Sequence, residues 1–255
     1  MTQTVSPELL AAPLVLEGRI MPASNATFFG TAGDTQVVYK PIAGEKPLWD
    51  FPDGTLANRE IASYAVSEAL GWDVVPLTFL RDGPHGPGMV QVWQEPDPDQ
   101  FPVDLVSPDE VPRGWKHVLD ASDARGAPVS LIHEDSLPLR RMALFDVVVN
   151  NADRKGGHVL GMAGGHRYGV DHGVSFNTDN KLRTVLWGWA GELLDDVEVE
   201  AVTRLLVDDA LAATLSALVT RNEVRAFQRR CELLLSRGSF PDPSSQWPAI
   251  PWPAF

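Results

Sequence analysis

The sequence predicts an α+β protein with two parts: a small antiparallel β-rich part with one helix over about 1–94, and a larger, mostly helical part over 95–255. Three observations support this prediction. Residues 14–41 alternate apolar and polar side chains between turn-forming residues, as antiparallel strands do. Apolar residues recur at helical spacing over 136–149 and again near the C-terminus. Between these patterns, residues 95–110 contain six acidic residues, four prolines and no lysine or arginine, which indicates an irregular exposed hinge.

The N-terminal region is predicted to form three strands, over about 15–20, 26–30 and 35–41. The turn between the first two contains Ser24 and Asn25. Backbone amides and hydroxyls in such a turn are able to contact phosphate oxygens. A purely local Ser-Asn hairpin turn is the alternative interpretation.

The third strand presents Val38 and Lys40 on one face, because side chains two residues apart on a strand point the same way. A strand lysine is usually a solvated surface residue, which is the alternative here. A nucleotide site needs a small apolar side chain over the base and an ammonium for the phosphates, and this strand face offers both.

A helix is predicted over 56–70, with Thr55 or Asp53 as its cap and Gly71 as its end. Glu60 lies in its first turns next to an apolar stripe formed by Ile61, Tyr64, Ala65 and Ala69. We expect Glu60 to lie at the edge of the buried face, within reach of Lys40. Glu68 is the competing candidate, and a solvated surface glutamate is the alternative for either residue.

Two further strands are predicted over about 74–80 and 88–94, joined by a Gly/Pro hairpin. The second strand ends in Val92, Trp93 and Gln94 at the start of the hinge. Its tryptophan has an ordinary alternative role in a hydrophobic core, because large aromatic side chains mostly pack.

The helix over 136–149 leads into a polar loop that contains Asp153 and Arg154, then a short hairpin around Gly164 and Gly165, and then the turn Asp171-His172-Gly173. We expect the hairpin to bring the carboxylates of Asp153 and Asp171 together. Two such carboxylates are suited to phosphoryl transfer, since one can orient the attacking hydroxyl while the other holds a metal ion.

The segment Asn-Asn-Ala-Asp-Arg-Lys-Gly-Gly-His over 150–158, followed by Val-Asp-His-Gly over 170–173, resembles the catalytic loop and metal-binding turn of the phosphatidylinositol 3-/4-kinase-like kinases. This group includes the bacterial HipA-type serine/threonine kinases. The resemblance implies a bilobal protein-kinase-like fold of that type, with ATP and Mg²⁺ (or Mn²⁺) in the cleft between the lobes. It also implies Asp153 as the catalytic carboxylate and Asp171 as the main metal ligand, with Asn151 supporting the loop.

The same resemblance assigns Lys40 to the nucleotide phosphates, with Glu60 as its partner, and Arg154 to the loop or a phosphate. It also implies further nucleotide contacts from the turn, the apolar strand face and the strand before the hinge, namely Ser24, Asn25, Val38, Val92, Trp93 and Gln94.

One position departs from the family pattern: His158 stands where the family has its second metal-binding asparagine. Mg²⁺ prefers oxygen ligands to imidazole. Either His158 binds a softer divalent ion, or a water replaces the asparagine, or transfer is weak or lost. In the last case the protein would be a nucleotide-binding pseudokinase that serves as a sensor or scaffold.

A metal-dependent hydrolase is the remaining alternative, because four potential ligands are close in sequence: His158, His166, Asp171 and His172. They lack the paired helical spacing of a zincin, and two of them lie on the predicted hairpin.

The composition limits the partners. With 34 acidic and 21 basic residues, the formal net charge is −13, which gives no basic footprint for a nucleic acid or an anionic membrane. A protein hydroxyl or a small metabolite is therefore the expected acceptor rather than a phosphoinositide.

No apolar run reaches the length of a membrane span, and a single cysteine, Cys231, excludes an intrachain disulfide. The apolar N-terminal run is broken by Pro13 and Glu17, so we expect no signal peptide and a cytoplasmic location.

The C-terminal region is predicted to form two or three amphipathic helices over 195–237, with Asn222 as a cap and Gly238 as an end. The proline-rich tail that follows is expected to be an extended strap with Trp247 and Trp252 packed against the surface.

Overall fold

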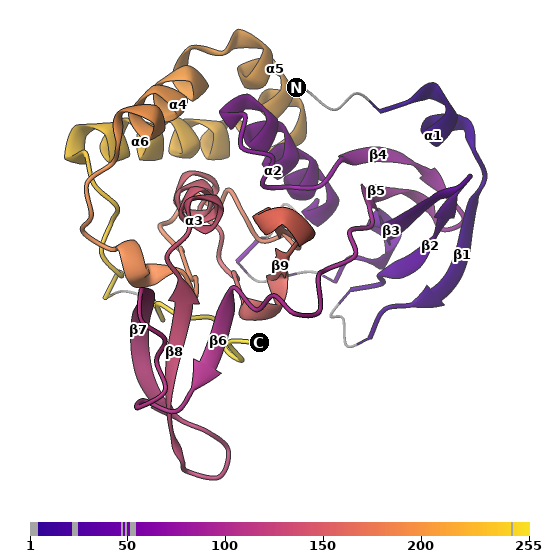
Figure 1. Cartoon of the computed structure of the whole chain (residues 1–255). Helices are drawn as coiled ribbons and strands as arrows, with labels where there is room; N and C mark the ends of the chain where they lie inside the picture. The colour runs from indigo at the N-terminus through magenta and orange to yellow at the C-terminus, as the bar shows by residue number, and fades with distance from the viewer. Residues whose placement is uncertain (1–4, 22–24, 47, 49, 52–54, 246) are drawn as a thin grey trace.

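The computed structural model describes residues 5–21, 25–46, 48, 50–51, 55–245 and 247–255. Within this part of the chain the fold is a mixed α/β arrangement of antiparallel sheets and helices (Figure 1). The N-terminal sheet lies on one side of Figure 1 and the C-terminal helices on the other, with β9 between them.

The N-terminal sheet has five strands in the order β1-β2-β3-β5-β4, and each neighbouring pair is antiparallel. Its strands are β1 (Leu14–Arg19), β2 (Phe28–Ala32), β3 (Thr35–Pro41), β4 (Thr78–Gly83) and β5 (Gly86–Val92). On β3, Val37 and Tyr39 are fully buried, while Val38 and Lys40 face the other side. The buried face forms a small core together with the short helix α1 (Pro7–Ala11), which the sequence did not predict.

Helix α2 (Leu56–Leu70) has the predicted bounds and ends at Gly71, whose φ of +70° favours glycine. Its start is capped differently from the prediction. Thr55 occupies the N-cap position but makes no capping hydrogen bond with its side chain. The carboxylate of Glu45 instead accepts hydrogen bonds from the amides of Leu56 and Ala57, at 3.0 and 2.8 Å. The other predicted cap, Asp53, lies outside the described residues.

Helix α2 lies between the five-stranded sheet and the C-terminal helices. It packs against β4 and β5 on one side and against α4 and α5 on the other. Ala62, Val66 and Leu70 belong to the larger hydrophobic core, which is formed mainly by residues after 95.

The prediction of an irregular segment followed directly by helix is wrong for part of the chain between 103 and 134. This segment forms a three-stranded antiparallel sheet in the order β6-β8-β7, with strands β6 (Val103–Val106), β7 (Trp115–Ser122) and β8 (Pro128–Glu134). Part of the acidic stretch 95–110 lies on β6, which is an edge strand, and the Asp104 side chain on it is exposed. The middle strand β8 buries four consecutive residues from Ser130 to His133, so it lacks the alternation that identifies a half-exposed strand.

Helix α3 (Leu137–Val149) starts at the N-cap Ser136 and is central to the larger core. The predicted hairpin follows as β9 (Val159–Gly161) and β10 (Arg167–Gly169). The remaining helices are α4 (Asp196–Val207), α5 (Asp209–Leu218) and α6 (Arg221–Arg237), and four short 3-10 helices cover Ile42–Gly44, Gly156–His158, Ala163–Gly165 and Trp187–Trp189.

Helix α6 ends at Gly238 as predicted, but its cap is Thr220 and not Asn222. Thr220 and Glu223 form a reciprocal capping box at this end. Cys231 is buried on the same helix, and burial raises the pKa of its thiol to about 12.

The C-terminal tail lies against the segment after the hairpin. The Ala249 carbonyl accepts hydrogen bonds from Trp187 Nε1 and the Thr184 amide, and Lys181 Nζ lies 4.6 Å from the centre of the Trp247 ring. The expectation that Trp252 is packed is wrong, because 86% of its surface is exposed.

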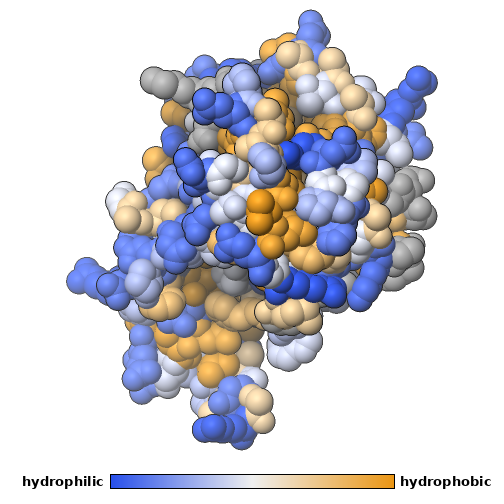
Figure 2. All heavy atoms as spheres, turned by 90° about the vertical axis from the view of Figure 1, so that its right-hand side faces the viewer, coloured by the Kyte–Doolittle hydropathy of each residue, from blue (hydrophilic) through white to orange (hydrophobic). Residues whose placement is uncertain are grey.

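Hydrophilic side chains cover much of the face that carries the five-stranded sheet, with apolar patches between them (Figure 2). In the described part of the chain, no helix combines the length and the apolar character that crossing a bilayer requires.

Candidate active site

Three ionic side chains from separate elements meet where the two halves of the molecule face each other. Lys40 Nζ on β3 lies 2.6 Å from Glu60 Oε1 on α2 and 2.8 Å from Asp171 Oδ1, which follows β10. The side chain of Glu60 is almost completely buried, whereas about half of the Asp171 side chain is exposed. The sequence-based pairing of Lys40 with Glu60 rather than with Glu68 is therefore present in the structure.

The charges in this cluster are mutually dependent. Burial opposes the charge of Lys40, but the Asp171 and Glu60 carboxylates outweigh it and raise the lysine pKa above its usual value. The Lys40 ammonium lowers the pKa of Asp171 below its usual range, against the effect of burial. Burial raises the pKa of Glu60, and Lys40 opposes that shift. The cluster thus keeps Lys40 as a cation and Asp171 as an anion.

The backbone around Asp171 directs its side chain toward Lys40. Its φ of +61° lies in the left-handed region, where aspartate and asparagine are among the better tolerated residues other than glycine. The next amide, that of His172, donates a 2.8 Å hydrogen bond to Glu60 Oε2. Glu60 therefore holds both Lys40 and the turn that carries Asp171.

The loop after α3 holds Asp153 next to this cluster. Asn151 Oδ1 accepts a 3.0 Å hydrogen bond from the Asp153 amide, and Asn151 Nδ2 donates to Asp146 at 2.9 Å, so Asn151 supports the loop as expected. Asp153 Oδ2 lies 3.4 Å from Lys155 Nζ, and 30% of the Asp153 side chain is exposed. Burial raises the pKa of Asp153, while the positive charge of Lys155 opposes the shift.

Of the two roles expected for Arg154, holding the loop or a phosphate, the structure supports the loop and not the phosphate contact. Its side chain is completely inaccessible and forms two hydrogen bonds to the Asp146 carboxylate, at 2.8 and 2.9 Å. Its guanidinium also donates to the carbonyls of His158 and Val170, both at 3.1 Å. These contacts fix the two ends of the hairpin to α3, so Arg154 positions Asp153 and Asp171 but cannot contact a substrate.

The Nε2 atom of His158, the ring nitrogen that could bind a metal ion, faces Asp171. His158 Nδ1 lies 3.0 Å from the Asp153 carbonyl, which can only accept a hydrogen bond, so Nδ1 carries the proton and Nε2 has a free lone pair. That Nε2 atom lies 3.5 Å from Asp171 Oδ2. Burial lowers the pKa of His158, which favours the neutral imidazole. A carboxylate and a neutral imidazole suit a borderline divalent ion better than Mg²⁺.

The four-residue cluster expected for a metal-dependent hydrolase is not formed. His166 Nε2 bonds to the Asp73 carbonyl at 2.9 Å, and His172 Nε2 lies 2.6 Å from the buried Arg154 guanidinium. No group of three or more His, Cys, Asp or Glu side chains within the described ranges is arranged to hold a metal ion.

A cavity of about 430 Å³, here called the first cavity, opens beside the ionic cluster. Glu60 does not line this cavity, but most other predicted site residues do: Asn25, Val38, Lys40, Val92, Trp93, Gln94, Asp153, His158 and Asp171. Ser24, also predicted, lies outside the described residues. The rings of Trp93 and Phe29 pack edge to face, with 5.2 Å between their centres. Trp93 therefore packs against the sheet and also lines the cavity.

The strand before the hinge offers few free backbone donors in the described part of the chain. The amides of Val92 and Trp93 already donate to the carbonyls of Leu77 and Gln36, both at 2.9 Å. Among the residues that the structure describes, the Gln94 amide donates no hydrogen bond.

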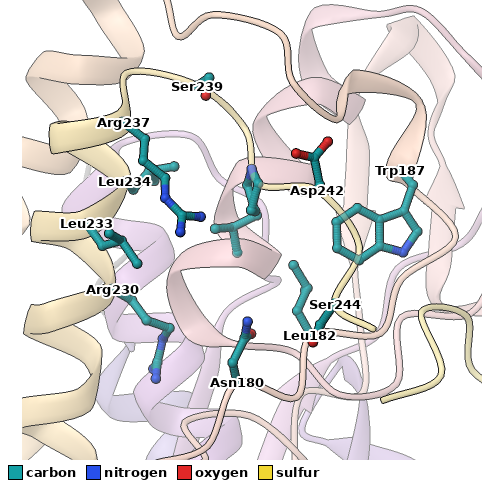
Figure 3. A pocket seen from close by; sticks show the side chains of 12 residues that line it. Asn180, Leu182, Trp187, Arg230, Leu233, Leu234, Arg237, Ser239, Asp242 and Ser244 are labelled. Carbon is teal, nitrogen blue, oxygen red and sulfur yellow. The ribbon is translucent and has the colours of Figure 1, made fainter. Parts of the chain in front are cut away.

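A second cavity of about 520 Å³ lies against the same ionic cluster and shares Asn25, Lys40, Asp153, Lys155 and Asp171 with the first. A smaller cavity of about 130 Å³ lies elsewhere, between α6 and the C-terminal tail (Figure 3). Its lining includes Arg237 and Asp242 and no residue of the other two cavities, so it is separate from the candidate site.

Two buried residues that support this site, Arg59 and Asp146, were not predicted from the sequence. Arg59, next to Glu60 on α2, is buried and bonds to Glu223 Oε1 at 2.5 Å and to the Ser175 carbonyl at 2.8 Å. It fixes α2 to both α6 and the segment after Asp171. Asp146, the partner of Arg154, was also missed, although an acidic residue within the apolar run of α3 indicates a buried partner.

The chain is similar to a solved structure in its fold and to a known protein in its sequence. No protein-family model matches it. The crystal structure of a proinflammatory kinase of Helicobacter pylori, CtkA, aligns over 90% of this chain and 97% of that one, with a TM-score of 0.48 and 9% sequence identity. Protein Rv2133c of Mycobacterium tuberculosis is 51% identical over 257 residues, which cover 95% of this chain and 92% of that protein. The chain therefore belongs to the same protein family as Rv2133c.

Proposed function

We propose that the chain is an ATP- and divalent-metal-dependent phosphotransferase of the phosphatidylinositol 3-/4-kinase-like type that acts on a hydroxyl group. The observation that carries this proposal is the double contact of Lys40 with Glu60 and Asp171, because it unites a β-strand lysine, a helix glutamate and the turn expected to bind a metal ion. Lys40 and Asp171 line both cavities, and Glu60 lines the second. In this proposal the lobes are residues 1–94 and 95–255, and the nucleotide lies between them.

The first cavity is the proposed nucleotide site. Val38, Val92 and Trp93 supply apolar surface for the base, and the Gln94 amide is the available donor for its edge. Lys40 lines the same cavity, and its ammonium would bind the phosphates. Asn25 is the described residue of the turn expected to cover them, and its Oδ1 accepts a 2.9 Å hydrogen bond from the Lys46 amide.

Asp171 and His158 are the proposed ligands of the divalent ion, which would neutralise charge on the phosphates. Both side chains line the first cavity, and the free lone pair of His158 Nε2 faces Asp171. This donor set fits Mn²⁺ better than Mg²⁺.

Asp153 is the proposed catalytic carboxylate, because it lines both cavities and so lies between a nucleotide in one and an acceptor in the other. The acceptor oxygen would form a bond to the terminal phosphorus of ATP while the bond from that phosphorus to the bridging oxygen breaks and ADP leaves. The hydroxyl proton would pass to Asp153.

One observation favours a second function. His158 replaces the oxygen ligand of the resembling family, and losing that ligand weakens the stabilisation on which phosphoryl transfer depends. A protein with this site could bind ATP as a sensor or scaffold without transferring phosphate.

ATP turnover separates the two functions. We expect Mn²⁺-dependent release of ADP by the native chain, and a loss of turnover in Asp153→Asn with nucleotide binding retained. Nucleotide binding without turnover under Mg²⁺ or Mn²⁺ would support the sensor instead. No nucleotide binding at all would contradict both.

A further inference from the structure

The second cavity differs from the first in the charge of its available groups. Three cationic side chains line it besides Lys40: Lys46, Lys155 and Arg183. Neither Lys46 nor Arg183 forms an ion pair within the described part of the chain, and Lys155 lies 3.4 Å from Asp153. Among the described residues, the Arg183 guanidinium donates to a neutral group, the Ala152 carbonyl, at 2.7 Å.

The acidic side chains of this cavity are mostly occupied by partners. Glu45 caps α2, Asp50 accepts a 3.0 Å hydrogen bond from Lys181, and Glu60 accepts one from Lys40. Asp171 accepts a 2.8 Å hydrogen bond from Lys40, Asp153 lies 3.4 Å from Lys155, and both carboxylates lie at the end shared with the first cavity. The rest of the second cavity therefore has available positive charge, in a chain with a formal charge of −13.

The size of the cavity favours a small molecule. A volume of about 520 Å³ lies within the usual range for metabolite sites. Leu48, Phe51 and the exposed Trp252 add apolar and aromatic surface beside the cations. A ring or carbon chain would find contacts here, in addition to an anionic group.

We propose that the second cavity binds the phosphoryl acceptor, and that this acceptor is a small soluble molecule with both a hydroxyl and a phosphate or carboxylate group. This inference rests on the proposed function and extends it to the substrate class. The hydroxyl would lie at Asp153, and the anionic group would contact Lys46 and Arg183. The transferred phosphoryl group forms a new ester with the acceptor oxygen, ADP leaves from the first cavity, and Asp153 takes the proton.

The test measures anion binding by titration calorimetry while the nucleotide site is filled. The protein is saturated with Mn²⁺ and a non-hydrolysable ATP analogue, and inorganic phosphate, glucose 6-phosphate or neutral glucose is added. We expect both phosphate compounds to bind, glucose to bind at least about tenfold more weakly than glucose 6-phosphate, and Lys46→Gln to weaken phosphate binding about tenfold. Lys46 suits this test because its ammonium has no partner in the described structure, so its loss leaves the catalytic loop in place.

The matched control is Arg113→Gln with Arg125→Gln, since both residues are exposed and neither lines a cavity of the candidate site. This control should bind phosphate as the native chain does. Absent phosphate binding, or equal binding by the native chain and Lys46→Gln, overturns the inference. If label from ATP is transferred to a serine/threonine peptide or to phosphatidylinositol vesicles while phosphate does not bind, the inference also fails, although the proposed function stands.

A failure of the proposed function gives a different pattern. If the ATP analogue does not bind, the phosphotransferase proposal is wrong. The phosphate titration of the free protein and of Lys46→Gln then still decides whether the second cavity is an anion site.

Discussion

Lys40 Nζ donates a 2.8 Å hydrogen bond to Asp171 Oδ1, across a separation of 131 residues. Both residues line the first cavity, one from the five-stranded sheet and one from the turn after the β9–β10 hairpin. Glu60 completes the contact from α2, since it accepts from both Lys40 and the His172 amide. The position of the lysine therefore depends on two carboxylates, and that dependence leads to the first prediction.

Replacing Glu60 by glutamine should weaken metal–ATP binding about tenfold, because Lys40 loses one of its two charge-assisted hydrogen bonds. Isothermal titration with Mn²⁺-ATP measures the effect. Glu68→Gln is the control, since Glu68 lies on the same helix but lines neither cavity. Equal affinities for Glu60→Gln and the native chain would mean that Glu60 does not position Lys40.

Arg154 should matter for stability rather than for substrate contact. Arg154→Met is expected to lower the free energy of unfolding by about 3–5 kcal/mol, because it leaves the Asp146 carboxylate buried without its partner. The same substitution in an Asp146→Leu background should cost much less, which a double-mutant cycle in urea will measure. The surface control Arg204→Met should change stability by less than about 1 kcal/mol. Additive losses would show that the pair is not a unit.

His158 should determine the preferred metal ion. With a free Nε2 lone pair facing Asp171, the native site should prefer Mn²⁺ to Mg²⁺, and His158→Asn should shift the preference toward Mg²⁺ by about 10-fold or more. Electron paramagnetic resonance of bound Mn²⁺, displaced by Mg²⁺ in the presence of ATP, gives the ratio without relying on turnover. The same ratio in both proteins would exclude His158 as a ligand.

His133 should make folding sensitive to acid. Its Nδ1 faces the Glu134 carbonyl, and its Nε2 accepts a 3.0 Å hydrogen bond from the Gly188 amide, so protonation would break the second contact. Burial lowers the pKa of His133 to about 4. Between the unfolded value near 6.5 and this pKa, the unfolded chain takes up a proton that the folded chain does not, and stability falls as the pH falls.

The size of this effect follows from the shift. Lowering the pH from 7 to 5 should cost the native chain about 2 kcal/mol more than it costs His133→Gln, as measured by urea unfolding. Glutamine can still accept from Gly188 but does not titrate. Equal losses in the two proteins would show that His133 does not cause the pH dependence.

Local sequence patterns predicted the elements that carry the candidate site. The alternation over β3 puts Val38 and Lys40 on one face, and the apolar stripe and Gly71 define α2. The pairing of Glu60 with Lys40 came from the family resemblance, since the local pattern left Glu68 as an alternative. The hairpin between Asp153 and Asp171 also follows from its glycines and short apolar runs.

Features that depend on distant partners were not predictable in this way. Helix α2 is capped by Glu45 from an earlier loop, and no local pattern indicates that contact. The sheet β6-β8-β7 was missed because buried β8 shows no alternation and its edge strand β6 is short and acidic. The resemblance left Arg154 with two roles, the loop or a phosphate, and the choice between them depends on Asp146 from the preceding helix.

The central claim is that Asp171 holds a metal-bound nucleotide beside Lys40, and binding of Mn²⁺-ATP to Asp171→Asn tests it most directly. Asparagine tolerates the φ of +61° and keeps the shape of the side chain while removing its charge. We predict that calorimetry will detect Mn²⁺-ATP binding by the native chain and by the control Asp179→Asn, whose exposed residue lines neither cavity, and a large loss in Asp171→Asn. No binding by the native chain, or unchanged binding by Asp171→Asn, would contradict the account.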